Sequence, residues 1–330
     1  MAQYVYDISK LNPGDILLER YDDKLSKFIM DKSNSDFSHA ILYDGNGSNL
    51  ESTLDIVVAN NISRTIIDDS QSVSVYRLKD CYYDPIVIEK AISYARLVYG
   101  TSYSQKDARA IITGIKDKDI NRQTCTRMVA QAYAVAGIKL VQDPDFCSTK
   151  EIEESPFLVR VDNVVRIANS LDIEFADSED VTVEMTIATI KLLRTIRKIT
   201  GYDIQTLNQV LFYLLEHPET DKEISQAAIE SGYFNVWKSE KDKNPWSYDT
   251  DLYFKKYKKM SLPAAMSHFK DLQSTWFRFQ NEYQKFLKMT DDQKKLTYIQ
   301  LQTSLYKDLL NNTCIKMMVV IQILQSYGVE

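Results

Sequence analysis

The sequence predicts an α+β domain, in which an antiparallel sheet packs on helices, followed by an all-α domain. The apolar pattern changes near residue 165: short β-rich runs separated by turn signals precede it, and apolar residues at helical spacing follow it. The chain has 330 residues, which is longer than a domain with a single hydrophobic core usually is. We therefore expect two domains, over residues 1–165 and 166–330.

The elements of the first domain are marked by turn and capping residues. The run Asp44-Gly45-Asn46-Gly47 predicts a hairpin between its two neighbouring strands. Asp84-Pro85 begins a helix that Gly100 ends, and Thr124 is a typical N-cap for a helix that ends at Gly137. Strands are predicted over 13–20, 37–47, 48–60, 72–78 and 156–161, and helices over 23–32, 84–100 and 124–138.

The second domain shows three apolar stripes at helical spacing, typical of a helical bundle core. Between them, the polar segment 239–260 reads as a solvated connector, and its basic cluster 255–259 as a contact for an anionic surface such as a membrane. The stripes are Ile204, Leu207, Leu211, Leu214 and Leu215; Phe269, Leu272, Trp276, Phe279, Tyr283 and Phe286; and Leu296, Ile299, Thr303, Tyr306 and Leu310.

Composition excludes several classes of function. The net charge of -6 argues against a nucleic-acid partner, which leaves peptides, small molecules, lipids or proteins. The four cysteines and three histidines have no zinc-binding spacing, and no nucleotide-binding or serine-hydrolase motif occurs, so we expect neither metal nor cofactor. Without a signal peptide or an apolar membrane span, the chain is expected in a cytoplasm or exported by another route.

Cys125 and His39 form a candidate nucleophile and base. Cys125 stands where a helix begins, and the positive end of the helix dipole stabilises a thiolate. A nucleophilic cysteine also needs a proton acceptor, and His39 is the histidine of this half of the chain. Cys81, Cys147 and Cys314 have no such partner in the sequence and are expected to be inert.

A catalytic histidine in turn needs a group that fixes its tautomer and holds its charge. The next strand of the predicted hairpin supplies Glu51, with Asn49 and Asp55 as lesser candidates on the same side by alternation. The sequence spacing alone is equally compatible with His39 as a strand-end or core histidine and with Glu51 as a solvated strand residue.

At these residues the sequence resembles a known family. The succession LNPGDILL, FSHAILY, NLEST, YGTSYS and TCTRMVAQAY is similar to the circularly permuted papain-like cysteine hydrolases, the NlpC-type superfamily in its YiiX/YebB-like branch. The resemblance covers about residues 8–165. It implies Cys125 as nucleophile, His39 as general base, Glu51 as the residue orienting His39, and Tyr103 as a residue of the cleft.

The resemblance implies hydrolysis through a thioester acyl-enzyme, with an amidase or peptidase activity favoured over a lipid acyltransferase or phospholipase. Two positions after the cysteine, the family often has an acidic residue, whereas this chain has Arg127. We expect Arg127 either to lower the pKa of the Cys125 thiol or to bind a substrate carboxylate. An alternative is a non-catalytic module whose helical domain binds a protein or a membrane. The substrate and the oligomeric state stay open.

Overall fold

The computed structural model describes residues 2–113, 118–119, 121–256 and 260–329 and confirms the predicted α+β class. The chain divides into two compact units. Unit 1 comprises Met1–Thr182 with Gln205–Leu207, and unit 2 comprises Val183–Ile204 with Asn208–Glu330. The predicted boundary at residue 165 falls on strand β8, which pairs with β1 inside unit 1.

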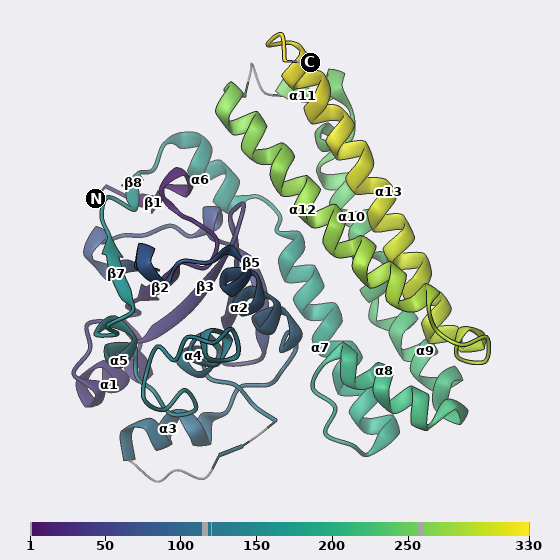
Figure 1. Cartoon of the computed structure of the whole chain (residues 1–330), viewed down its shortest axis with the longest axis horizontal. Coiled ribbons are helices and arrows are strands. Elements are labelled where there is room, and N and C mark those ends of the chain that lie inside the picture. Colours follow the sequence, from purple (N-terminus) through teal and green to yellow (C-terminus); the bar gives the residue numbers. More distant parts are fainter. Residues whose placement is uncertain (1, 114–117, 120, 257–259, 330) are drawn as a thin grey trace. The chain divides into compact units, whose positions relative to one another are not determined.

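Unit 1 is built on an antiparallel sheet with the strand order β5-β4-β3-β2-β6-β7 (Figure 1). A separate antiparallel pair joins β1 to β8. The strands are β1 Tyr4–Tyr6, β2 Ile16–Glu19, β3 His39–Gly45, β4 Ser48–Ser52, β5 Val57–Asn61, β6 Val73–Leu78, β7 Leu158–Val161 and β8 Val165–Ile167.

The predicted hairpin is present between β3 and β4. Gly45, Asn46 and Gly47 all adopt left-handed backbone angles, with φ of 107°, 55° and 75°, which explains the glycine and asparagine in this turn. The single strand predicted over 48–60 is instead two antiparallel strands, β4 and β5. The chain reverses between them, because Thr53 N–H and Thr53 Oγ1 both donate to the Ile56 carbonyl.

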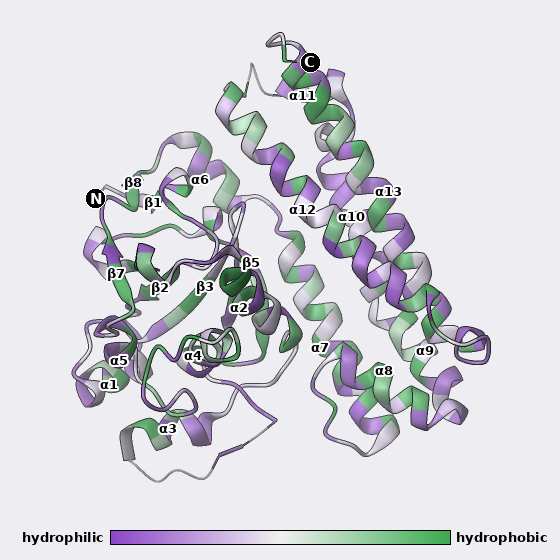
Figure 2. Cartoon of the chain, viewed as in Figure 1, coloured by the Kyte–Doolittle hydropathy of each residue, from purple (hydrophilic) through white to green (hydrophobic). Residues whose placement is uncertain are grey.

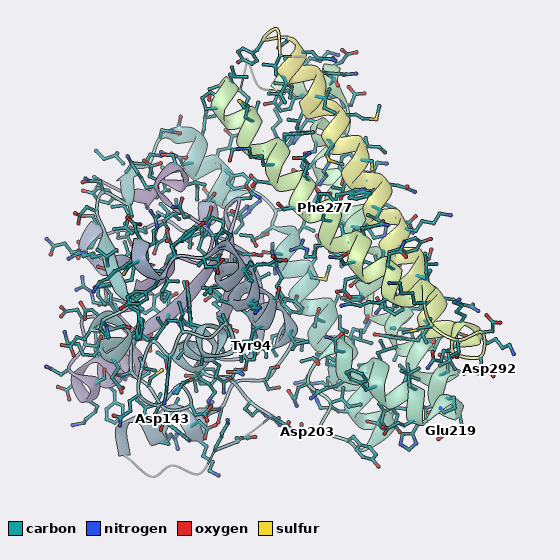
Figure 3. All side chains as sticks on the ribbon, in the orientation of Figure 1. Tyr94, Asp143, Asp203, Glu219, Phe277 and Asp292 are labelled. Atoms are coloured by element: carbon teal, nitrogen blue, oxygen red, sulfur yellow. The ribbon has the colours of Figure 1, made fainter. Side chains whose placement is uncertain are left out.

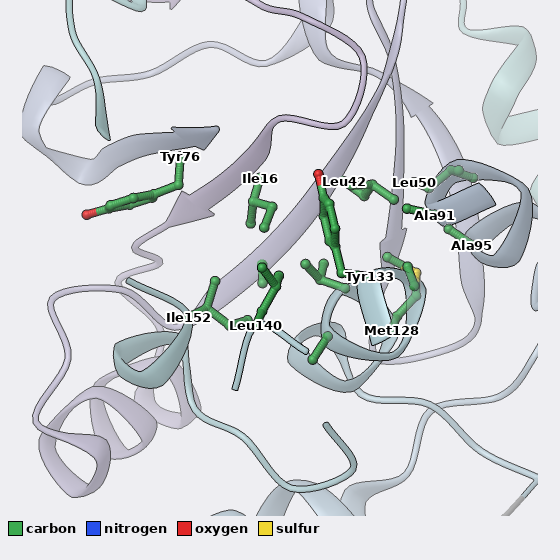
Figure 4. Close-up of a cluster of buried hydrophobic side chains, with 14 of the residues drawn as sticks. Ile16, Leu42, Leu50, Tyr76, Ala91, Ala95, Met128, Tyr133, Leu140 and Ile152 are labelled. Carbon is green, nitrogen blue, oxygen red and sulfur yellow. The ribbon is translucent and has the colours of Figure 1, made fainter. Parts of the chain in front are cut away.

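Helices α2 and α4 pack against each other and supply much of the core of unit 1. Figure 4 shows Met128 and Tyr133 of α4 facing Ile16, Leu42 and Leu50 of the sheet. This contact fixes α4, and therefore its first residue, relative to β3. The helices of unit 1 are α1 Lys24–Ser33, α2 Pro85–Leu97, α3 Gln105–Thr113, α4 Cys125–Val135, α5 Thr149–Glu153 and α6 Ser170–Asp177.

Unit 2 is helical in the part that the structure describes. The long helices α12 and α13 pack along each other, and polar and apolar residues alternate along both (Figure 2). Tyr306 of α13 stacks on Phe286 of α12, as the apolar stripes predict. The helices are α7 Val181–Thr200, α8 Leu207–Glu216, α9 Asp221–Ser231, α10 Val236–Lys243, α11 Thr250–Lys256, α12 Leu262–Leu287 and α13 Thr297–Gln325.

The prediction of a solvated connector over 239–260 was wrong. This segment contains the end of α10 and all of α11, and Tyr253 is buried against Ala265 and Val319. Its aromatic residues are therefore part of a helix packing surface. Of the basic cluster 255–259, residues 257–259 lie outside the described residues. Figure 3 shows the side chains of both units, with Phe277 of α12 as an example of an exposed apolar residue.

Across the described ranges, every helix is too short or too polar to span a membrane.

Candidate active site

Cys125 is the first residue of α4. The N-cap is Thr124, whose Oγ1 accepts the Arg127 N–H at 3.3 Å, as the sequence predicts. The thiol is largely buried, with 7% of the residue exposed. The N–H groups of Cys125 and Thr126 have no acceptor within the helix, so they are available to a negative charge at this position.

His39 begins β3 and meets Glu51 of β4. The distance between His39 Nε2 and Glu51 Oε2 is 2.7 Å. Glu51 pairs with Ile41 in the β3–β4 ladder, which puts Glu51 on the same face as His39 by alternation. Of the candidates Glu51, Asn49 and Asp55, it is Glu51 that contacts His39. The Asn49 side-chain amide donates to Glu51 Oε1 at 3.2 Å.

The imidazole of His39 also interacts with the Cys125 sulfur. Burial lowers the pKa of His39, but the charge and hydrogen bond of Cys125, together with those of Glu51, raise it well above its usual value. Because Nε2 faces Glu51, Nδ1 is the nitrogen left for the sulfur. The structure thus brings Cys125, His39 and Glu51 into one chain of hydrogen bonds.

The charges of this chain favour a thiolate and an imidazolium. Burial raises the pKa of Cys125, but the charge and hydrogen bond of His39 and the N–H groups of Ala40 and Thr126 bring it below its usual value. Burial likewise raises the pKa of Glu51, and its bonds to His39, Asn60 and Asn49 bring it below the usual value. Glu51 therefore stays ionised behind the imidazolium.

Tyr103 lies beside the thiol. Residues 102–104 run next to Gln123, since Ser104 N–H donates to the Gln123 carbonyl at 2.8 Å and Gln123 N–H to the Ser102 carbonyl at 3.0 Å. Tyr103 and Cys125 line the same cavity. Burial and then the Cys125 charge raise the pKa of Tyr103, so its phenol keeps its proton and remains a hydrogen-bond donor.

A tyrosine and a second carboxylate near His39 were missed in the sequence. The Tyr21 ring lies 5.5 Å from the His39 ring, and its hydroxyl donates to Glu19 Oε2 at 2.7 Å. Glu19, which faces His39 across the β2–β3 ladder, also accepts from Tyr6 at 2.7 Å. The strand predicted over 13–20 contains Glu19, and its pairing with the strand that carries His39 would have indicated that this carboxylate lies near the imidazole.

The structure argues against the predicted contact of Arg127 with a substrate carboxylate. Its guanidinium is buried and pairs with Asp107 Oδ2 at 2.7 Å, and its Nε donates to the Asp145 carbonyl at 2.9 Å. Both side chains of the pair are at most 1% exposed. A substrate carboxylate has no access to a group in this environment. The position of Arg127 therefore favours a role in holding α4, α3 and the loop after α4 together.

A second thiol, that of Cys147, lines the same cavity as Cys125. Burial raises the pKa of Cys147 well above its usual value. We expect iodoacetamide at neutral pH to modify Cys125 and to leave Cys147 intact, and denaturant to expose both. Mass spectrometry of the peptides measures this, and equal labelling of the two native thiols would contradict it.

Among the residues that the structure describes, no group of three or more His, Cys, Asp or Glu side chains is arranged to hold a metal ion.

Residues 10–150 match the model of a family described as permuted papain-like amidase enzymes, the YaeF/YiiX or C92 family. Among solved structures, the chain is similar to one described as the metalloprotein yiiX from Escherichia coli O157:H7. The identity is 15%, the TM-score is 0.31, and the match covers 46% of this chain and 97% of that one. A comparison with curated proteins found no match.

Proposed function

Since residues 10–150 belong to the permuted papain-like cysteine hydrolases, a family of amidases, we propose that this chain hydrolyses an amide bond through a thioester on Cys125. The observation that supports this proposal most is the contact of His39 with both Cys125 and Glu51. It provides a nucleophile, a base and an orienting carboxylate in the order that acyl transfer needs.

In the first step, the Cys125 thiolate attacks the carbonyl carbon of the substrate. The electron pair of the C=O bond moves to oxygen. We assign the Cys125 backbone N–H, at the start of α4, and the Tyr103 hydroxyl, from the same cavity wall, as the donors to this oxyanion. The imidazolium of His39 then gives its proton to the leaving nitrogen while the C–N bond breaks. The acyl group remains on sulfur as a thioester.

In the second step, neutral His39 takes a proton from water, and the resulting hydroxide attacks the thioester. The C–S bond breaks and the acid leaves, which restores the thiolate and the imidazolium. Glu51 keeps its charge, because its interactions with His39, Asn60 and Asn49 bring its pKa below the usual value. The Tyr21 ring lies against the His39 ring, with 5.5 Å between the ring centroids.

The proposal is tested by incubating the full chain with a panel of acyl and aminoacyl p-nitroanilides and quenching in acid. We expect released nitroaniline and a mass increase on the Cys125 peptide equal to the acyl group less the one hydrogen it replaces. Cys125→Ala should show neither, whereas Cys81→Ser, which changes an exposed thiol, should behave as the wild type. Release of nitroaniline by Cys125→Ala would overturn the proposal.

Replacing Glu51 by Gln keeps the shape of the side chain and removes its charge. The pKa of His39 should fall, because Glu51 contributes to raising it. We expect kcat/KM to fall by about 10²-fold, the lower end of a general acid and base contribution. The alkaline limb of the pH profile should move to lower pH, since the imidazolium loses its proton earlier. An unchanged alkaline limb would contradict the role of Glu51.

A further inference from the structure

A small cavity of about 30 Å³, partly open to solvent, lies next to the candidate nucleophile within unit 1. Its walls come from α1, α3, the start of α4 and the chain before α5, and Cys125 and Tyr103 are part of them. Helix α3 was absent from the sequence prediction, so this cavity was not foreseen. Its chemistry indicates which part of a substrate it holds.

The cavity has an uncharged wall among the described residues. Ile29, Ala108 and Ile111 contribute apolar side chains, and none of the described residues that line it is acidic or basic. The thiol of Cys147 is also neutral, because burial raises its pKa. A charged group placed here would lose its hydration without gaining a partner.

Most of the hydroxyl groups in the wall already donate to the protein. Ser33 donates to the Ile29 carbonyl, Thr126 to the Cys147 carbonyl and Thr149 to the Phe37 carbonyl, at 2.6–2.7 Å. Ser38 and Ser148 donate to the Glu19 carbonyl and to Glu151 Oε2, at 3.4 and 2.9 Å. These side chains therefore present mainly carbon to a ligand, and a polar ligand finds few donors.

The cavity lies on the acyl side of the reaction. The leaving nitrogen has to face His39, which gives it a proton, and His39 is not part of the cavity wall. Thr124, Cys125 and Thr126 are part of it, so a group bound to the Cys125 sulfur adjoins the cavity directly. The acyl group is the part of the substrate that stays on that sulfur.

We propose that this small cavity binds the acyl group of the substrate next to the scissile bond and that this group is a short, uncharged aliphatic chain. The inference rests on the proposed function, and it names the substrate class: amides of aliphatic acids rather than of acidic or basic amino acids. Each buried methylene should improve the reaction until the cavity is full, and a charge of either sign at the end of the chain should weaken it.

The test uses the full chain and alkyl methanethiosulfonates, which transfer an S-alkyl group to a thiolate and release methanesulfinate. The methyl, butyl and hexyl reagents are compared with the aminoethyl and sulfonatoethyl reagents. We expect the rate at Cys125, relative to exposed Cys81 in the same molecule, to rise by up to about fourfold per methylene. Both charged reagents should react more slowly than butyl.

Two substitutions on α3 localise the effect. Ala108→Phe fills the cavity and should lower the ratio of hexyl to methyl rates at Cys125, and Ile111→Ala enlarges it and should raise this ratio. Arg109→Phe places the same ring on an exposed position of the same helix and should leave the ratio unchanged. A ratio that is flat with chain length, or that Ala108→Phe does not alter, overturns the proposal.

This experiment is separate from the test of the proposed function, because it needs the thiolate and the cavity but no turnover. Chain-length selectivity at Cys125 without a thioester from any p-nitroanilide would overturn the proposed function and keep the aliphatic site. Turnover without selectivity would overturn the aliphatic site alone.

Discussion

Cys125→Ser and His39→Ala are each expected to lower kcat by about 10³-fold or more, because the nucleophile and its base act as one unit. The hydroxyl of a serine has a much higher pKa than a thiol, so His39 holds no anion beside it. In His39→Ala, the thiolate loses the charge that stabilises it and the leaving group loses its proton donor. The double variant should be little worse than either single variant.

The measurement is the steady-state release of nitroaniline by the three variants, with correctly folded protein established by circular dichroism. Tyr82→Phe changes an exposed residue and controls for effects of mutagenesis and purification, so it should keep the wild-type rate. Losses that multiply in the double variant would show that Cys125 and His39 act independently, which contradicts the hydrogen-bonded chain.

Arg127→Met is expected to lower the free energy of unfolding of unit 1 by about 3–5 kcal/mol, because it leaves the Asp107 carboxylate buried without its partner. Asp107→Leu should have a similar effect. The double variant should lose less than the sum of the two, since it removes both charges. Arg20→Met breaks the exposed pair with Asp69 and should cost at most about 1 kcal/mol.

The stability of unit 1 needs its own reporter, because Trp237, Trp246 and Trp276 all lie in unit 2. Cys147 provides one, since it is fully buried in unit 1. The urea dependence of its labelling by iodoacetamide measures the opening of this unit. If Arg127→Met shifts this curve no more than Arg20→Met does, the buried pair does not stabilise unit 1. That result would favour a role for Arg127 in substrate binding instead.

The sequence predicted the parts of the fold that local residues determine. Thr124 caps α4, Asp84 and Pro85 begin α2, and the glycines and asparagine of residues 45–47 turn the β3–β4 hairpin. These features depend on contacts within a few residues, so they are visible in one sequence. The proximity of His39 and Glu51 follows from the same hairpin.

The parts that were missed depend on contacts between distant residues. Asp107 is the partner of Arg127, and nothing in the spacing of the two reveals that α3 lies beside α4. A capping signal was nevertheless present: Ser104 Oγ accepts the Asp107 N–H at 3.1 Å, and Ser-x-x-Asp often begins a helix. This signal would have predicted α3, although not the cavity it helps to form.

The pH dependence of Cys125 alkylation tests the central claim most directly, namely that His39 keeps this thiol ionised. The rate of carbamidomethylation of the Cys125 peptide is followed from about pH 4 to pH 9 in the wild type and in His39→Ala. The lowered pKa of Cys125 predicts a wild-type midpoint below the ordinary value for a thiol, about 8.5. In His39→Ala, burial still opposes the thiolate and only the N–H groups of Ala40 and Thr126 remain to stabilise it, so the midpoint should rise towards the ordinary value or above it. A wild-type midpoint at the ordinary value, or one that His39→Ala leaves in place, would contradict the ion pair.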